Sequence, residues 1–245
     1  LVFYLKYIIV IRELLKESQN TIPEFLDETI FYLGKSYNLL CANKGNGMLF
    51  NGNFEEPNKE FDNYLNFHKY KFKDDTNETG GYVVLKNKKF FLAVDIGRSP
   101  DKKFSKDYQA GVLSFEFNFS GEKVITNSGY FQDHRHQLNI ISKSSATHST
   151  LVLNNKSTVN FERDKYGHML VNKSFKILNK EIKNEKDFWS IRASHDAYSK
   201  SNGVIYERTL QCFHERYSLE GCDKLIKTKH FKPSNFEIRF HLLPN

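Results

Sequence analysis

The sequence has few cysteines and lacks the short motifs by which many catalytic sites are recognised. Its 245 residues include three cysteines, Cys41, Cys212 and Cys222. Three cysteines are too few for a disulfide framework, and without a CxxC pair a thiolate zinc site is not expected. A glycine-rich phosphate loop, a nucleophile elbow and an HExxH helix are also missing, which excludes the enzyme classes that those motifs identify.

The sequence also lacks a hydrophobic run long enough for a membrane span. The opening run LVFYLKYIIVI is apolar, but Lys6 interrupts it and Arg12 and Glu13 follow it. It is too short to cross a bilayer, and it has neither the basic start nor the cleavage site of a signal peptide. We interpret it as a buried helix. Because the chain begins with Leu1, we expect it to be a piece of a longer protein.

The net charge is +7, which favours an anionic partner, either nucleic acid or an acidic polysaccharide. The alternative is a lysine-rich surface that reflects an AT-rich coding bias. No Lys/Arg run is dense enough for a nucleic-acid-binding tail. The 22 Phe and 13 Tyr residues fall at strand spacing, which indicates a core and not a base-stacking platform. We therefore expect no nucleic-acid partner.

Helical periodicity dominates the first part of the chain. Residues 1–18 and 22–42 are predicted helices, and a short helix is expected over 59–67. Thr21 or Asn20 can cap the second helix, with Pro23 near its first turn. Residues 43–58 are rich in Gly and Asn and are predicted to be a loop. The expected division is a helical segment over 1–75 and a β-domain over 76–245.

After about residue 78 the hydrophobic period changes from 3.6 to 2, which predicts a large antiparallel β-sandwich. VLSFEFNF (112–119) alternates with Leu113 and the phenylalanines on one face. In FEIRFHLL (236–243), the hydrophobic residues are expected to point inward and the polar residues outward. The inward set is Phe236, Ile238, Phe240 and Leu242, and the outward set is Glu237, Arg239 and His241. The other expected strands are 81–86, 90–95, 122–127, 149–153, 168–178, 187–193 and 204–213.

Two local clusters contain groups that are able to do chemistry. In DHRH (133–136), His134 and His136 could share one face of an extended segment and bind a metal, with His148 or Asp133 as third ligand. The alternative is a solvated polar loop, which we favour, because an HxH pair alone is a weak signal.

The second cluster is SHDAY (194–198). A His–Asp pair can orient an imidazole for general base work, and a tyrosine can act as an acid. However, His195 and Asp196 are neighbours on a predicted strand, so their side chains point to opposite faces. A strand end followed by a polar turn is the favoured interpretation.

Six segments occur in a characteristic order along the β-domain. They are GGYVVLKNKKFFLAVDIG (80–97), AGVLSFEF (110–117), KVITNSG (123–129), ATHSTLVL (146–153), SHDAY (194–198) and FEIRFHLLP (236–244). Together they resemble the C-terminal domain of the heparinase II/III-like polysaccharide lyases, and GMLFNGNFE (47–55) is similar to the end of that family's α/α toroid.

The resemblance implies cleavage of uronate-containing polysaccharides by β-elimination. In the family a base removes the proton α to the uronate carboxyl group and an acid protonates the leaving glycosidic oxygen. The main Tyr and its Asn or His partner come from the toroid, most of which is absent from this chain. The implied location is the bacterial cell envelope or periplasm, and heparan-type glycosaminoglycans, alginate and other uronate polymers are all possible substrates.

The resemblance also implies site positions on the sandwich. Many members have an HxH pair, of which one His is catalytic and the other binds zinc, together with an Asp ligand from a DPG-like turn and a His ligand from an AHST-like motif. The corresponding residues here are Asp107, Gln109, Asn127 and His148. Because Gln and Asn are poor zinc ligands, we expect no cofactor in this chain. Zinc is possible in the family, but most of its ligand set is missing here.

Two functions remain from these observations. The first is the sandwich part of a lyase with His148 and Asp107 as catalytic residues. The second is a non-catalytic sandwich of the same descent that binds glycan or only scaffolds. Acidic polysaccharide and the missing toroid are the expected partners. The expected substrate-binding residues are Gln109, Asn127, His134, His136 and Arg239.

Overall fold

The computed structural model describes residues 1–41, 47–53, 59–73, 76–232 and 234–243. The chain forms two compact units, one of residues 1–48 and 55–80 and the other of residues 49–54 and 81–245. The segment around Asn51 thus belongs with the strands, although it precedes them by about thirty residues and separates two parts of the helical unit. Most of the predicted 43–58 loop lies outside the described residues.

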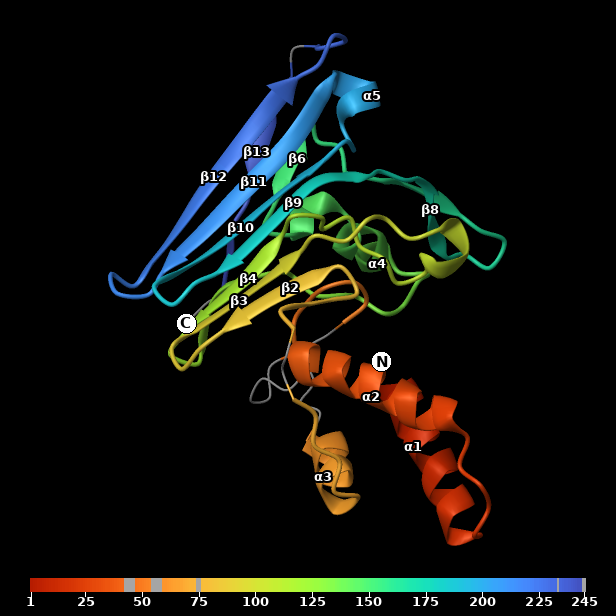
Figure 1. Cartoon of the computed structure of the whole chain (residues 1–245). Coiled ribbons are helices and arrows are strands. Elements are labelled where there is room, and N and C mark those ends of the chain that lie inside the picture. Colours follow the sequence, from red (N-terminus) through yellow and green to blue (C-terminus); the bar gives the residue numbers. More distant parts are fainter. Residues whose placement is uncertain (42–46, 54–58, 74–75, 233, 244–245) are drawn as a thin grey trace. The chain divides into compact units, whose positions relative to one another are not determined.

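The helical unit contains the three helices that the sequence predicts (Figure 1). They are α1 (Val2–Glu17), α2 (Glu24–Cys41) and α3 (Lys59–Phe67), followed by the short strand β1 (Glu78–Thr79). The opening apolar run is helical, with Leu5 and Ile9 fully buried against Ile30, Tyr37, Phe61 and Leu65. Among the described helices, none is both long and apolar enough to traverse a lipid bilayer.

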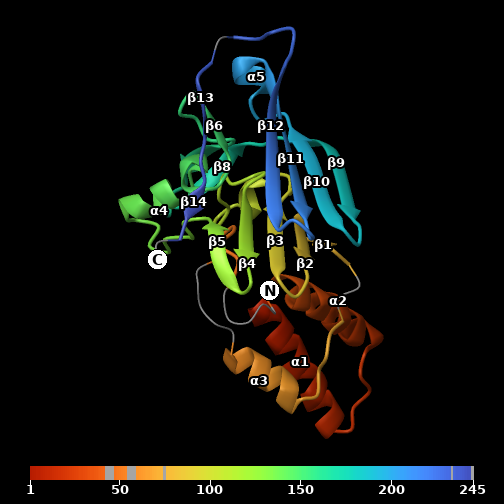
Figure 2. The same cartoon turned by 90° about the vertical axis from the view of Figure 1, so that its left-hand side faces the viewer.

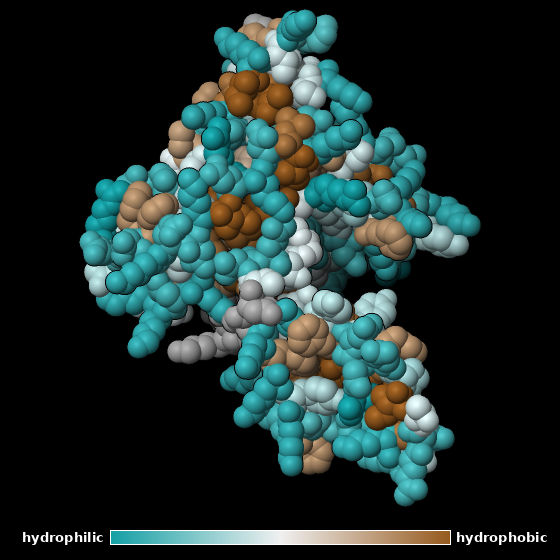
Figure 3. Space-filling view, in the orientation of Figure 1, coloured by the Kyte–Doolittle hydropathy of each residue, from teal (hydrophilic) through white to brown (hydrophobic). Residues whose placement is uncertain are grey.

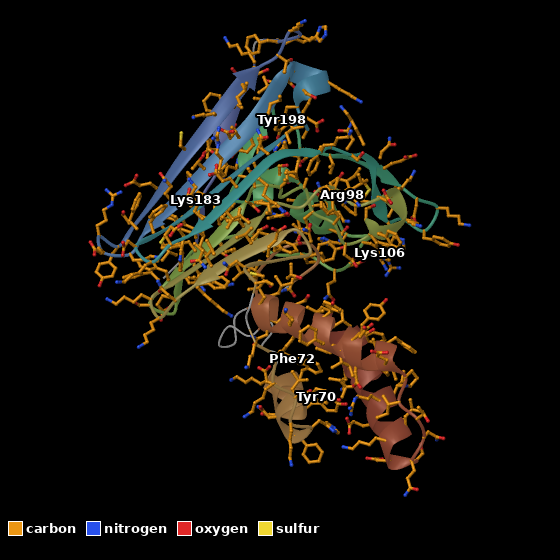
Figure 4. All side chains as sticks on the ribbon, viewed as in Figure 1. Tyr70, Phe72, Arg98, Lys106, Lys183 and Tyr198 are labelled. Carbon is orange, nitrogen blue, oxygen red and sulfur yellow. The ribbon has the colours of Figure 1, made fainter. Side chains whose placement is uncertain are left out.

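The helices also present hydrophobic side chains to solvent, visible as brown patches among hydrophilic residues (Figure 3). Tyr70 and Phe72, labelled in Figure 4, stack with ring centroids 6.2 Å apart. Phe72 covers Gly34, where an added Cβ would lie 2.0 Å from the ring. The exposed hydrophobic residues of α1, α2 and α3 are Phe3, Tyr4, Tyr7, Ile11, Leu14, Phe25, Phe31, Tyr32 and Phe67.

The second unit is an antiparallel β-sandwich, as the sequence predicts. One sheet has the order β2-β3-β4-β5-β14 and the other has the order β12-β11-β10-β9; Figures 1 and 2 show the two layers. The first sheet comprises β2 (Tyr82–Lys86), β3 (Phe90–Asp95), β4 (Phe115–Phe119), β5 (Glu122–Thr126) and β14 (His241–Leu242). The second comprises β9 (Ile177–Asn184), β10 (Phe188–His195), β11 (Val204–Phe213) and β12 (Ser218–Lys227).

Two short strand pairs and several helical turns complete the unit. The pairs are β6 (Leu151–Leu153) with β13 (Phe236–Ile238), and β7 (Asn160–Arg163) with β8 (Met169–Lys173). The helical turns are η1 (Lys102–Phe104), α4 (Gln137–Ser142), η2 (Ser145–Thr147) and α5 (Ser199–Asn202).

The hydrophobic core lies between the two sheets. Leu92 and Phe115 from the first sheet belong to the same buried cluster as Trp189, Ile191 and Leu210 from the second. An ion pair between the buried Arg208 and the half-buried Asp223 joins β11 to β12, since Arg208 Nε donates to Asp223 Oδ1 over 2.7 Å. Arg208 Nη1 also donates to the carbonyl of Ser149 over 2.7 Å, which links the second sheet to the loop that precedes β6.

The end of the chain differs from its predicted arrangement. Residues 236–243 form two short strands in different pairings, because β13 pairs with β6 and β14 pairs with β5. Phe236, Phe240 and Leu242 are 56%, 53% and 67% exposed, so their predicted inward orientation is wrong. Both strands lie at the end of their sheets, where one neighbour is missing and alternation does not guarantee burial.

Other strand predictions differ in extent. The predicted strand 168–178 is divided between β8 and β9, and neither β7 nor β12 was predicted. β12 contains a glycine and few inward hydrophobic residues, so its alternation is weak. The predicted strand over 112–119 begins only at Phe115, because Leu113 has a left-handed φ of 60° and therefore cannot continue an extended strand.

Candidate functional site

Asp107 is an exposed carboxylate that lies beside a tyrosine hydroxyl. It follows η1, and Tyr130 Oη donates to Asp107 Oδ1 over 3.2 Å. Gly52 packs against the same residue, since an added Cβ at residue 52 would lie 2.7 Å from Asp107 Cβ. Burial raises the pKa of Tyr130, and the neighbouring carboxylate of Asp107 also raises it. The phenol therefore keeps its proton and can donate it, while Asp107 can accept one.

Gln109 lies two residues further on and is fully buried. Its Nε2 donates to the carbonyls of Gly129 over 2.9 Å and Ser142 over 2.6 Å. Its Oε1 accepts from the backbone N–H of Gly52 over 3.1 Å. The backbone N–H of Gln109 donates to Asn51 Oδ1 over 2.9 Å. The side chain thus joins three segments that are distant in sequence, and it is enclosed by protein.

His148 is 2% exposed and lies at the end of η2. Its Nδ1 has no hydrogen-bond partner in the part of the chain that the structure describes. Burial lowers the pKa of His148 to about 3, with a smaller contribution from the neighbouring His241. The imidazole is therefore neutral near pH 7, because the low-polarity surroundings disfavour its charged form.

Asn127 is 1% exposed and lies close to the loop of His148. Its Oδ1 accepts from the backbone N–H of Ser149 over 2.9 Å, and its own N–H donates to Glu116 Oε1 over 3.2 Å. Glu116 Oε1 also accepts from the backbone N–H of Leu49 over 3.1 Å. Burial raises the pKa of Glu116. These bonds attach the loop of His148 to β4 and to the segment around Leu49.

Gln109 connects the Asp107 group to the His148 group. Gly129, which accepts from Gln109, follows Asn127 by two residues and precedes Tyr130. Ser142 accepts from both Gln109 and Thr147 Oγ1, which is one residue before His148. The four site positions that the family resemblance implied therefore lie in one region of the sandwich, where hydrogen bonds link them. Of these four positions, Asp107 is exposed, whereas the other three are buried.

The structure does not bring His134 and His136 together as a pair of ligands. His136 is the N-cap of α4, and its Nδ1 accepts from the backbone N–H of Leu138 over 3.1 Å. His134 instead lies against His168, with ring centroids 4.5 Å apart. His168 in turn contacts Asp164, with Nδ1 and Oδ2 3.3 Å apart. Both predicted residues stay accessible enough to contact a ligand.

Arg239 lies between β13 and β14. Its Nη2 donates to Glu237 Oε2 over 2.6 Å, and its Nη1 donates to the carbonyl of Ala146 over 3.2 Å. It therefore contacts the loop that leads to His148. Part of its side chain is exposed, so the guanidinium can still approach an anionic group.

The SHDAY segment is the end of β10 followed by a turn, as the favoured interpretation predicts. His195 is fully buried, and burial lowers its pKa to about 3. Asp196 Oδ1 accepts from the backbone N–H of Lys176 over 2.7 Å. Tyr198, labelled in Figure 4, donates to the carbonyls of Leu151 and Lys156 over 3.2 Å each. Its side chain is 1% exposed.

Tyr130 and Lys143 were not selected from the sequence. Tyr130 directly follows the NSG turn, and this adjacency was the available signal. Lys143 had no such signal: it is 1% exposed and donates to the carbonyls of Lys106, Tyr108 and Met169. Lys106, labelled in Figure 4, immediately precedes Asp107. Lys143 thus supports the backbone beside the exposed carboxylate.

The donor set does not fit zinc. Structural zinc sites use four Cys, His or carboxylate ligands. Gln109 has both amide atoms bonded to backbone groups, and Asn127 Oδ1 is bonded to Ser149. Over the described ranges, no group of three or more His, Cys, Asp or Glu side chains is placed to hold a metal ion. His148 is left as the one family-type ligand position with a suitable donor.

Comparison with solved structures gives the same fold at low sequence identity. A heparinase III, the BT4657 gene product, matches 91% of this chain and 36% of its own, with TM-score 0.70 and 14% identity. The heparan sulfate lyase HepC from Pedobacter heparinus matches 92% of this chain and 37% of its own, with TM-score 0.67 and 12% identity. The chain therefore spans about a third of the length of these enzymes.

The sequence comparisons identify a family but no individual curated relative. No curated protein gives a significant match to the chain. The family model described as heparinase II/III-like, C-terminal, matches residues 75–245, which include both sheets of the sandwich and the positions Asp107, Gln109, Asn127 and His148. The match covers more than half of the chain, and so the chain belongs to the heparinase II/III-like family through its C-terminal domain.

Proposed function

We propose that the chain is the sandwich part of a polysaccharide lyase that cleaves uronate-containing acidic polysaccharides by β-elimination. The observation that carries this proposal is the exposed Asp107 carboxylate with the Tyr130 hydroxyl 3.2 Å away. Asp107 occupies a position where many family members have a His of the HxH pair. A proton acceptor and a proton donor are the two groups that β-elimination requires.

In the proposed reaction, a base takes the proton on the carbon α to the uronate carboxyl group. The electron pair of that C–H bond forms the new C=C bond, the glycosidic C–O bond breaks, and an acid protonates the leaving oxygen. Asp107 is the base in this scheme. Tyr130, whose raised pKa keeps it protonated, is a local proton donor.

In this proposal His148 supports Asp107 and Tyr130 and does not contact the sugar. Its side chain is 2% exposed, so a polysaccharide cannot contact it directly in this conformation. We propose that it keeps the 146–149 loop in place, so that the catalytic role expected for it becomes a positioning role. Gln109 and Asn127 are equally enclosed, and we assign them the same kind of role.

The accessible groups for binding acidic sugars are His134, His136 and Arg239. Arg239 can form charge-assisted hydrogen bonds with a uronate carboxylate or a sulfate. The net charge of +7 favours the approach of a polyanion. We propose that an α/α toroid of the same protein completes the cleft, in keeping with the one-third coverage of the solved relatives. A bacterial cell-envelope or periplasmic location is part of this proposal.

A second function is favoured by one specific observation. Gln109 and Asn127 stand at positions where the family has His and Asp, and both are bonded as structural groups. A sandwich of this descent without catalysis would bind acidic glycan and leave it intact. Alginate, heparan-type chains and other uronate polymers are substrates or ligands under either proposal.

The experiment is an ultraviolet absorbance assay for the unsaturated uronate product, using the complete protein and a panel of acidic polysaccharides. Asp107→Asn is compared with Asp101→Asn, an exposed aspartate at the start of η1. Product from the wild type and from Asp101→Asn, but not from Asp107→Asn, supports the lyase. Binding of a polysaccharide without product from any protein identifies the non-catalytic sandwich instead.

A further inference from the structure

The family's zinc positions are occupied here by side chains that make other bonds. Gln109 is fully buried, and its amide is bonded to Gly52, Gly129 and Ser142. A metal ligand needs a free lone pair directed at the ion, whereas the Gln109 oxygen already faces a backbone N–H and its nitrogen is a donor. The Gln109 side chain cannot coordinate a metal ion without breaking its present hydrogen bonds.

The bonds of Gln109 have the effect that a bound metal has in other proteins, because they tie separate segments together. Gly52 lies on the segment before the sandwich strands, Gly129 follows β5, and Ser142 ends α4. Each bond uses a buried or half-buried backbone group. Such groups are costly to leave unpaired in the interior, so the one side chain satisfies three of them at once.

Asn127 adds a second amide connection. Its Oδ1 accepts from Ser149 N–H over 2.9 Å, and Ser149 Oγ accepts from His241 N–H over 3.1 Å. The two imidazoles in this area, His148 and His241, each have one ring nitrogen without a partner among the described residues. Two imidazoles alone do not complete the ligand set of a structural zinc site, and the neighbouring amides are already engaged.

We propose that this sandwich holds its site region together without zinc, and that the Gln109 side chain supplies the cross-link among the Gly52, Gly129 and Ser142 segments in place of the metal. The inference concerns structure and does not depend on lyase activity. A non-catalytic glycan-binding sandwich would use the same cross-link.

The test combines zinc content with thermal unfolding of the full chain. The protein is incubated with zinc chloride, dialysed and measured for bound zinc, and its Tm is recorded with and without EDTA. We expect less than about one zinc per ten chains, and a Tm that EDTA leaves unchanged, because an unbound metal adds no stability. One zinc per chain that survives dialysis, with a Tm lowered by EDTA, would overturn the proposal without any variant.

The second arm replaces Gln109 with Met, which has similar volume and no amide. We expect the Tm to fall by roughly 5–10 °C, because the Gly52 N–H and the Gly129 carbonyl lose the Gln109 amide and the Ser142 carbonyl keeps only its bond from Thr147 Oγ1. Gln132→Met, at an exposed loop position, is the matched control and should leave the Tm within about 1 °C. An equally small change in Gln109→Met would show that the amide is not the cross-link. A variant that does not fold at all agrees with the proposal, and the wild-type zinc measurement still decides it.

Discussion

Gly111 lies directly against the imidazole of His148. A Cβ added to residue 111 would stand 2.2 Å from His148 Cδ2, and 3.0 Å from both Cγ and Nε2. Gly111 follows Gln109 by two residues, so the same loop between η1 and β4 provides the amide cross-link and the surface that the imidazole contacts. Because His148 is fully enclosed, it has little room to move away from a larger neighbour.

Gly111→Ala should therefore destabilise the sandwich, by about 1–3 kcal/mol, through overpacking against the imidazole. Chemical denaturation with urea measures this change. Gly221→Ala is the matched control, since the new Cβ there would be 3.5 Å from Leu210 Cδ2, an ordinary contact. In a double-mutant cycle, the Gly111→Ala penalty should shrink in a His148→Ala background. Additive penalties would rule out a direct clash between the two side chains.

The neutral state of His148 should make stability depend on pH. Burial lowers its folded pKa from 6.5 to about 3, so between these values the unfolded chain binds a proton that the folded chain does not. The contribution of His148 to the free energy of unfolding is therefore at its maximum above about pH 6.5, and it decreases as the pH falls. From about pH 7 to about pH 5 the contribution of this one group is a loss of about 2 kcal/mol.

Comparison of variants isolates this effect from other titrating groups. His195 acts in the same direction, with a pKa lowered to about 3, whereas burial raises the pKa of Asp95 to about 7 and opposes it. His148→Gln should lose less stability between the two pH values than the wild type, by about 2 kcal/mol. The exposed His230→Gln variant should follow the wild type. Parallel pH profiles for wild type and His148→Gln would refute a buried neutral His148.

The pairing of Tyr130 with Asp107 should appear in the kinetics if the chain is part of a lyase. Tyr130→Phe removes the hydroxyl that lies 3.2 Å from Asp107 Oδ1. We expect kcat to fall by roughly 100–10,000-fold, the typical contribution of a general acid or base, with KM little changed. Tyr166→Phe, at an exposed tyrosine of the β7–β8 turn, should leave kcat unchanged. An unchanged kcat in Tyr130→Phe would remove this tyrosine from the mechanism.

Lys143 should contribute strongly to stability, although it has no carboxylate bonded to it among the described residues. Its Nζ donates to the carbonyl of Met169 over 3.1 Å and to that of Tyr108 over 3.3 Å, and it also bonds the carbonyl of Lys106. Burial lowers its pKa to about 8. Lys143→Met should cost about 2–4 kcal/mol, because these carbonyls lose a charged donor. Lys106→Met, at an exposed side chain, is the control. A loss below about 0.5 kcal/mol in Lys143→Met, measured by urea denaturation, would contradict the assignment.

Some elements could be predicted because their pattern is local. The expected strand 204–213 is β11, the expected strand 90–95 is β3, and the expected helix 59–67 is α3, each with the predicted bounds. In these segments, the alternation or helical spacing of apolar residues agrees with the face that the core covers. The order of short family-like segments along the chain also predicted the sandwich and the family.

The inward and outward faces at 236–243 could not be predicted in the same way. The alternation in FEIRFHLL is regular, yet β13 and β14 pair with different strands and leave Phe236 and Phe240 exposed. Burial at the end of a sheet depends on what lies beside it, which the alternation within the strand does not specify. The alternation of hydrophobic residues therefore predicted a strand but not which of its faces is buried.

The sequence by itself determined the sandwich, the three helices and the family, because hydrophobic periodicity and motif order are properties of the chain itself. Only the tertiary structure decided which groups each candidate residue contacts and whether solvent reaches it. Tyr130 meets Asp107 across 23 residues, and Gln109 reaches Gly52 across 57. Burial then distinguished the exposed Asp107 from the enclosed Gln109, Asn127 and His148. Such roles depend on solvent access and hydrogen-bond partners, and both arise only when distant segments pack together.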